Sequence, residues 1–167
     1  MQVEIFVFVG RAVIWRIRMT EVIYSRKVQY YETDKMGLVH HSNYIRWFEE
    51  ARGLFFEKND LDYAKWESFG IVVPVIEVSV KYRNHLTYGD GFYCKVIPAD
   101  FKYVKFSFDY EIYNSDTNKL CTIGSTSHCF LDKSLKLLRI NHEFPETFEK
   151  MKKLFKEGNN SEPPGIR

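Results

Sequence analysis

The first regular pattern along the chain is an alternation of apolar and polar side chains in residues 22–31. A period close to two places successive side chains on opposite faces of an extended chain, so it predicts a strand with one covered face. Arg26 interrupts the apolar face. Residues 33–37 contain Asp34 and Gly37, which supply turn chemistry and are expected to end the strand.

A helical pattern follows in residues 44–58, with Ser42 or Asn43 as the expected N-cap. Its apolar side chains cover well over half of the helical circumference and are Tyr44, Ile45, Trp47, Phe48, Ala51, Leu54, Phe55 and Phe56. A helix this apolar is expected to be wrapped by other elements instead of resting on a surface. Asn59 and Asp60 end it, and a short helix fits residues 62–69.

Beyond Gly70 the chain becomes rich in β-branched and aromatic residues, which predicts strands at 71–82, 91–97, 102–113 and 120–131. Turn residues separate them at 87–90, 98–100 and 114–118. Strands joined by such short turns pair antiparallel. A brief strand-like stretch at 137–140 and a helix from Pro145 to about Phe155 complete the order. The pattern therefore predicts an α+β fold in which a curled antiparallel sheet wraps around a long central helix.

Composition narrows the class of protein. A length of 167 residues suits one domain with a real core, and the net charge of only +2, without clustered Lys and Arg, argues against a nucleic-acid partner. The three cysteines are odd in number and lack metal-binding spacing, so we expect buried free thiols, no disulfide, no metal site and a cytoplasmic location.

Three segments are expected along the chain. Residues 1–18 form an N-terminal appendage or, alternatively, an extra edge strand; residues 19–157 form the domain; residues 158–167, with Gly, Asn, Ser and two Pro, form a loose tail. The apolar run at residues 5–9 is too short to cross a bilayer, so no membrane span is expected.

The most informative stretch is YYETDKMGLVHHSNY at residues 30–44, continued by WFEEAR at residues 47–52. This pattern resembles the signature of the 4-hydroxybenzoyl-CoA thioesterase family, in its bacterial acyl-CoA thioesterase branch. The resemblance implies a hotdog fold, hydrolysis of acyl-CoA thioesters, and assembly into a homo-oligomer, a dimer or a tetramer of dimers. It implies no cofactor beyond the coenzyme A of the substrate.

The resemblance also implies roles for three residues. Asp34 falls on the acidic residue that acts as general base or nucleophile, and His41 falls on the position whose backbone N–H faces the thioester oxygen. Tyr30 falls on an aromatic position that lines the site. The arrangement makes physical sense, because a helix N-terminus presents unpaired N–H groups to the charge that develops on a thioester carbonyl. A carboxylate seven residues earlier can act from the opposite side.

Alternatives remain at the level of sequence. Asp34 also fits a turn residue that bonds its own backbone, His41 a structural histidine, and Tyr30 a core residue. A hotdog acyl-CoA hydratase or dehydratase and a non-enzymatic acyl-CoA-binding module are rival functions. For the nucleotide end of coenzyme A, the candidates are Lys81, Arg83 and Lys102, although each also fits a solvated surface.

Overall fold

The computed structural model describes residues 22–61 and 63–159. The predicted appendage at residues 1–18 lies outside the described residues. The last helix continues to Asn159, past the predicted start of the tail at residue 158, and residues 160–167 also lie outside the described part.

The elements follow the predicted order of one strand, a long helix and a run of strands. In chain order they are β1 (Val22–Lys27), η1 (Tyr30–Glu32), α1 (His41–Lys58), α2 (Tyr63–Ser68), β2 (Val75–Tyr82), β3 (Gly91–Lys102), β4 (Lys105–Asn114), β5 (Leu120–Cys129), α3 (Ile140–Glu143) and α4 (Pro145–Asn159).

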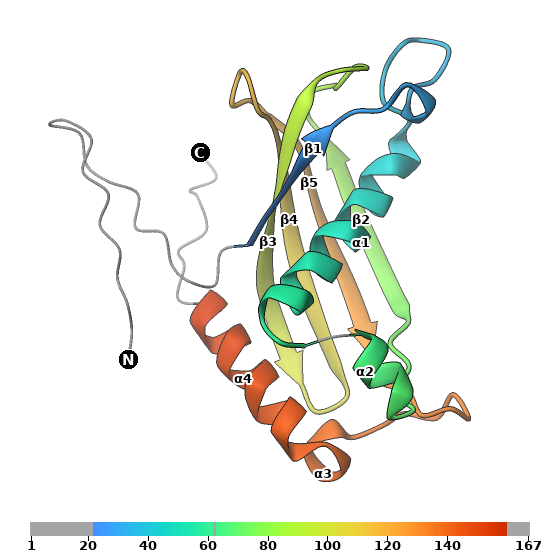
Figure 1. The fold of residues 1–167 in the computed structure, drawn as a ribbon, viewed down its shortest axis with the longest axis vertical. Helices are drawn as coiled ribbons and strands as arrows, with labels where there is room; N and C mark the ends of the chain where they lie inside the picture. Colours follow the sequence, from blue (N-terminus) through green and yellow to red (C-terminus); the bar gives the residue numbers. More distant parts are fainter. Residues whose placement is uncertain (1–21, 62, 160–167) are drawn as a thin grey trace, which may run out of the picture.

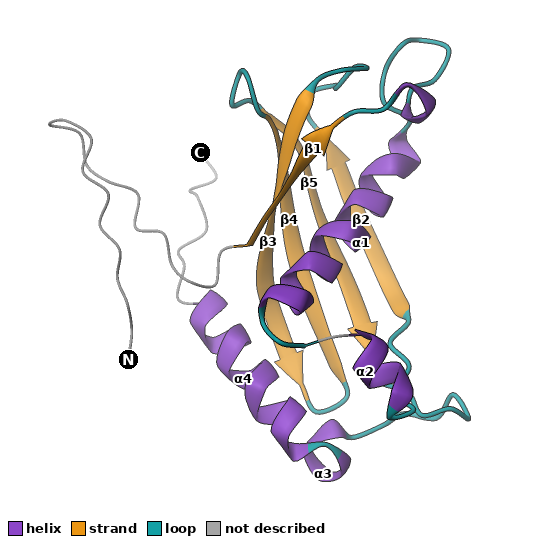
Figure 2. Ribbon diagram, viewed as in Figure 1, coloured by secondary structure: helices purple, strands orange, loops and turns teal. Residues whose placement is uncertain are grey.

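The strands form one five-stranded sheet in the order β1-β3-β4-β5-β2, and every neighbouring pair is antiparallel. Helix α1 crosses one face of this curled sheet, while α4 packs beside the lower part of β3 in the view of Figure 1. Figure 2 shows the same layering, with the helices on the concave side of the strands. This is the hotdog arrangement, so the predicted α+β fold class is confirmed.

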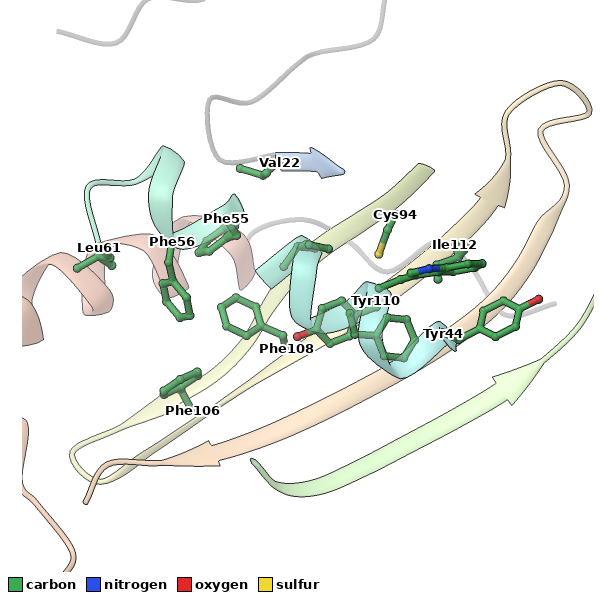
Figure 3. Packing of buried hydrophobic residues seen from close by; sticks show 14 of the residues in the cluster. Val22, Tyr44, Phe55, Phe56, Leu61, Cys94, Phe106, Phe108, Tyr110 and Ile112 are labelled. Carbon is green, nitrogen blue, oxygen red and sulfur yellow. The ribbon is translucent and has the colours of Figure 1, made fainter. Parts of the chain in front are cut away.

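Helix α1 is held to the sheet by an aromatic interface. Its buried positions recur with helical spacing and are Asn43, Tyr44, Trp47, Phe48, Ala51, Arg52, Phe55 and Phe56. Figure 3 shows Phe55 and Phe56 facing Phe106 and Phe108 of β4. The opposite face carries exposed Arg46, Glu49 and Glu50. In the single chain, the sheet therefore encloses α1 on one side only, which is less than the sequence led us to expect.

Gly124 in β5 explains how closely the helix approaches the sheet. A Cβ atom at this position would collide with the ring of Phe48 and would also lie 3.1 Å from the carbonyl oxygen of Ser79. The Phe48 ring is stacked on Tyr110, with 4.4 Å between ring centroids. Only glycine leaves room for this contact, so the position of α1 depends on it.

Several predicted boundaries were wrong. Strand β1 ends at Lys27, because the chain turns into η1 four residues before Asp34. Strand β3 runs through Pro98, where a turn was predicted, and the true turn lies between Lys102 and Lys105. The register between β3 and β4 shifts just after Pro98, and within the described residues the pairing of β1 with β3 reaches from Gly91 to Val96. A proline, which has no N–H, is tolerated at such an irregularity in the pairing.

Two further expectations can be compared with the structure. Cys94, Cys121 and Cys129 are free and buried, as predicted. Among the described residues, no helix has both the length and the apolar character that a membrane crossing requires.

Candidate active site

Asp34 lies in a tight loop between η1 and α1. The Asp34 N–H donates to the carbonyl oxygen of Leu38 at 2.8 Å, and the Gly37 N–H donates to the carbonyl oxygen of Asp34 at 2.9 Å. Gly37 has φ of +74°, a value that favours glycine. Thr33 and Val39 form an antiparallel bridge next to this turn. The loop is thus a small hairpin with a defined backbone.

The two carboxylate oxygens of Asp34 have different surroundings. Oδ1 accepts a hydrogen bond from the Met36 N–H at 2.8 Å, which is the turn-stabilising role that the sequence left open. Oδ2 has no hydrogen-bond or ion-pair partner among the described residues. The side chain is half-buried. One oxygen therefore orients the carboxylate, and the other is available to a substrate or a water molecule.

Helix α1 begins at His41, three residues earlier than predicted, and its N-cap is His40 instead of Ser42 or Asn43. The His40 ring accepts from the Ser42 N–H at 3.4 Å and lies 2.9 Å from Ser42 Oγ. Asn43 reaches back instead, and its Nδ2 donates to the Glu32 carbonyl oxygen at 2.7 Å. The N-cap differs from the predicted one because Nδ1 of His40 accepts the capping hydrogen bond.

The first turn of α1 leaves one donor free. Within the described part of the chain, no residue accepts a hydrogen bond from the His41 N–H. The His41 side chain is exposed and its ring centroid lies 4.1 Å from that of His40. An unpaired N–H at a helix N-terminus is suited to bind a developing negative charge.

The loop and the helix start are tied together at residue 32. The His40 N–H donates to the carbonyl oxygen of Glu32 at 2.8 Å, so residues 32 and 40 lie side by side. Asp34 is two residues further out along the hairpin, and two extended residues span about 7 Å. Asp34 and the first turn of α1 therefore lie near each other, and the described residues show no direct hydrogen bond between them.

Tyr30 has a different setting from the one expected for a lining residue. Its side chain is 77% exposed, and its ring packs edge-on against Tyr88 with 5.7 Å between centroids. The residue belongs to η1, not to a strand end. Its place within the site stays a prediction.

Glu32 was missed at the level of sequence. It is 3% exposed, and its carboxylate accepts from Arg26 Nη1 at 3.0 Å and Nη2 at 2.5 Å, from Trp47 Nε1 at 2.9 Å and from the Gln29 N–H at 2.7 Å. Burial opposes its ionisation, but the bonds from Arg26, Gln29 and Trp47 prevail and lower the pKa of the carboxyl. The available signal was Arg26 on the apolar face, which needs an opposite charge.

Tyr82 was also missed. Its hydroxyl donates to the carbonyl oxygen of His41 at 3.0 Å, and its ring packs edge-on against Tyr44. Burial raises the pKa of Tyr82, so the hydroxyl stays protonated and can donate. The residue is 41 positions away from His41. Nothing in the local sequence indicates that contact.

The three basic candidates for the nucleotide do not lie together. Lys81 precedes Tyr82 at the end of β2, and the exposed Arg83 follows it, which puts both near the start of α1. Lys102 lies at the other end of β3 from Gly91, roughly 36 Å along the strand. It forms an ion pair with Asp100 at 3.4 Å. The structure thus separates Lys102 from the candidate site.

Comparisons with a family model and with known proteins agree on one family. A model of the Thioesterase-like superfamily matches residues 28–152. The Bacillus subtilis protein named "Putative acyl-CoA thioesterase YneP" is 32% identical over 131 residues, which cover 76% of this chain and 94% of the relative. A 1,4-dihydroxy-2-naphthoyl-CoA hydrolase from Thermosynechococcus vestitus is 27% identical over 109 residues, covering 65% of this chain and 74% of the relative.

A solved structure agrees with the sequence matches. The DHNA-CoA thioesterase from Staphylococcus aureus superposes with a TM-score of 0.80 at 30% identity, covering 88% of this chain and 99% of that protein. The family match spans both the Asp34 loop and the whole of α1. The chain therefore belongs to the thioesterase-like superfamily and is a thioesterase with the hotdog fold.

Proposed function

We propose that this thioesterase hydrolyses acyl-CoA thioesters to a free acid and coenzyme A, with Asp34 as the acidic catalytic residue. The observation that carries the proposal is that a half-buried carboxylate lies near the start of α1, and that no described residue bonds either its Oδ2 or the His41 N–H. The names of the relatives, which include acyl-CoA and 1,4-dihydroxy-2-naphthoyl-CoA, support this class of substrate.

In the proposed chemistry, the His41 N–H and the Asp34 carboxylate have separate roles. The thioester carbonyl oxygen binds at the His41 N–H, where negative charge develops in the tetrahedral state. Asp34 either attacks the carbonyl carbon, forming an acyl-enzyme that water then hydrolyses, or takes a proton from a water molecule that attacks directly. The C–S bond breaks and coenzyme A leaves as the thiolate, which is then protonated. His41 and Tyr30 side chains are proposed to contact the substrate.

The family resemblance extends this proposal to the 4-hydroxybenzoyl-CoA thioesterase branch and to an oligomer. Edge strand β2 is exposed on both faces and displays Val75, Ile76 and Val78 at 47%, 55% and 39%. An unpaired apolar edge is a template for a second strand. We propose that two copies join their sheets through β2, as a dimer or within a tetramer, in a reducing cytoplasm that keeps the cysteines free.

Thiol release from a panel of acyl-CoAs tests the function. The panel contains 4-hydroxybenzoyl-CoA, 1,4-dihydroxy-2-naphthoyl-CoA and aliphatic acyl-CoAs of several lengths. We expect wild-type protein to release thiol and Asp34→Asn to lower kcat by about 10²–10⁴-fold. Lys35→Gln, in the same turn and exposed, is the matched control and should keep its rate. An Asp34→Asn protein as active as wild type would refute the role of Asp34.

The same panel separates the rival functions. A hydratase would modify the β-carbon of an enoyl-CoA without releasing thiol, and a binding module would retain acyl-CoA unchanged. Single-turnover hydrolysis in ¹⁸O-labelled water then distinguishes the two roles of Asp34. Label in the Asp34 carboxylate indicates direct attack, whereas label confined to the product acid indicates an activated water.

Sedimentation of wild type and Ile76→Lys tests the proposed interface. A charge on the free edge of β2 should dissociate the oligomer to monomers. Ile23→Lys is the control, because Ile23 is 50% exposed on the other edge strand, β1. Equal dissociation by both variants, or by neither, would place the interface elsewhere.

A further inference from the structure

The carboxylate two residues before Asp34 is built for a different task from that of Asp34 itself. Both oxygens of Glu32 are engaged, Oε1 by Arg26 and Trp47 and Oε2 by Arg26 and the Gln29 N–H. It is also almost completely buried. A carboxylate without a free lone pair or access to solvent cannot serve as a base for a substrate. Its chemistry is therefore confined to holding other groups.

The groups that Glu32 holds belong to three parts of the site. Arg26 is on β1, Trp47 is on α1, and Gln29 precedes η1. The Arg26 guanidinium also lies over the Trp47 ring, 5.5 Å from its centroid. Because one carboxylate ties strand, helix and loop together, none of these elements can shift relative to the others without breaking a charged hydrogen bond.

The backbone of Glu32 makes a second set of bonds to the start of the helix. Its carbonyl oxygen accepts from the His40 N–H at 2.8 Å and from Asn43 Nδ2 at 2.7 Å. The His40 bond closes the base of the Asp34 hairpin. The main chain of Glu32 thus bonds the first turn of α1, while its side chain bonds Arg26 of β1 and Trp47 of α1.

We propose that Glu32 is a positioning residue for the hydrolysis, and that it holds the Asp34 loop at a fixed distance from the first turn of α1. This inference rests on the proposed function. A displacement of about 1 Å between reacting groups can lower a rate about 10²-fold. Loss of the Glu32 hydrogen bonds should therefore lower kcat more than it raises KM, because the substrate still binds while its alignment with Asp34 is lost.

The test compares Glu32→Gln with Glu50→Gln. Glu50 is a matched control, since this exposed carboxylate also lies beside Arg26, with 3.5 Å between Oε2 and Nε, but it makes no contact with the Asp34 loop among the described residues. We expect Glu32→Gln to lower kcat about 10–100-fold with KM changed less than about threefold. Glu50→Gln should leave both constants near wild type. Trp47→Phe, which removes one donor to Glu32, should give a smaller loss of kcat and covers the case in which Glu32→Gln does not fold.

Making Glu32→Gln in an Asp34→Asn variant as well as in wild type shows whether Glu32 acts through Asp34. In Asp34→Asn protein, the further change Glu32→Gln should have little additional effect on the residual kcat, because the group being positioned has been removed. An equal fold-loss in both backgrounds would assign Glu32 a general structural role and overturn the proposal. A folded Glu32→Gln protein with wild-type kcat would overturn it as well.

Amide hydrogen exchange keeps this inference separate from the proposed function. In Glu32→Gln protein, the Asp34, Val39 and His40 N–H groups should exchange at least about tenfold faster than in wild type, with the strands of the sheet unaffected. That result is independent of any thioester. Unchanged exchange rates would contradict the proposal that Glu32 holds the Asp34 loop in place. An inactive wild type or an active Asp34→Asn protein would contradict only the proposed function.

Discussion

Helix α1 carries two buried polar clusters that are built from different chemistry. The site-end cluster consists of Arg26, Glu32 and Trp47 and is centred on an ion pair. The mid-helix cluster lies one to two turns further along and is centred on hydroxyl groups. Its members are Arg52, Tyr63, Tyr110, Thr126 and His128.

The bonds of the mid-helix cluster run in a chain. Arg52 donates from Nε to the Tyr63 hydroxyl at 2.9 Å and from Nη1 to the Tyr110 hydroxyl at 3.3 Å. Thr126 Oγ1 lies 2.9 Å from the Tyr110 hydroxyl and 2.8 Å from His128 Nε2. Arg52 thus bonds tyrosines in this cluster, while Glu49, three residues earlier on the same helix, is exposed.

The two clusters connect different parts of the molecule. The site-end cluster links α1 to edge strand β1 and to the loop that carries Asp34. The mid-helix cluster links α1 to α2 and to the interior strands β4 and β5. We infer that substitutions in the site-end cluster will lower both activity and stability. Substitutions in the mid-helix cluster should lower stability and leave activity largely unchanged.

The largest expected effect is that of Glu32→Ala. This change leaves the Arg26 charge and the Trp47 N–H without their partner, which should lower the free energy of unfolding by about 3 kcal/mol. Urea denaturation measures it. The double change Arg26→Met with Glu32→Met should be less destabilising than the single one, because no buried charge is left behind. A larger loss in the double variant would show that the ion pair is itself a net source of stability.

Acidification should affect the mid-helix cluster first. Burial and the nearby charge of Arg52 lower the pKa of His128 to about 3, against an ordinary value of 6.5. Between these limits the unfolded chain binds more protons, so the free energy of unfolding decreases as pH falls, by at most about 1.4 kcal/mol per pH unit. Urea denaturation at about pH 7 and about pH 5.5 measures the slope.

The control for that slope is His128→Gln, which should flatten it. The pKa of Glu32 is lowered from 4.5, so the site-end cluster keeps its full contribution above that pH and loses it only as pH falls further, through the pKa of the folded state. A slope between pH 5.5 and 7 that persists in His128→Gln would point to another titrating group.

The smallest expected effect is that of Tyr110→Phe. The variant keeps the ring stacked on Phe48 and removes only the hydroxyl that joins Arg52 to Thr126. We expect the free energy of unfolding to fall by about 1 kcal/mol, as for a typical buried hydrogen bond. Thiol release should stay within about twofold of wild type. A marked loss of kcat would break the division between the clusters.

Local features explain what could be predicted. The β-branched and aromatic runs located four of the five strands, although the predicted end of β3 falls well short of Lys102, and the apolar helical pattern located α1. Ends were less accurate where a tertiary contact competes with local chemistry. The cap moved to His40 because the Asn43 side chain donates instead to the Glu32 carbonyl oxygen, and β3 continues past Pro98, where its register with β4 shifts.

The sequence by itself determined the order of elements, the fold class and the position of the Asp34 turn next to the start of the long helix. These depend on periodicity and on residues close together in the chain. Only the tertiary structure decided that Glu32 pairs with Arg26 and Trp47, that Tyr82 bonds the first turn of α1, and that Lys102 lies far from it. Such contacts join residues up to 41 positions apart, and they arise from the curl of the sheet, which no local pattern encodes.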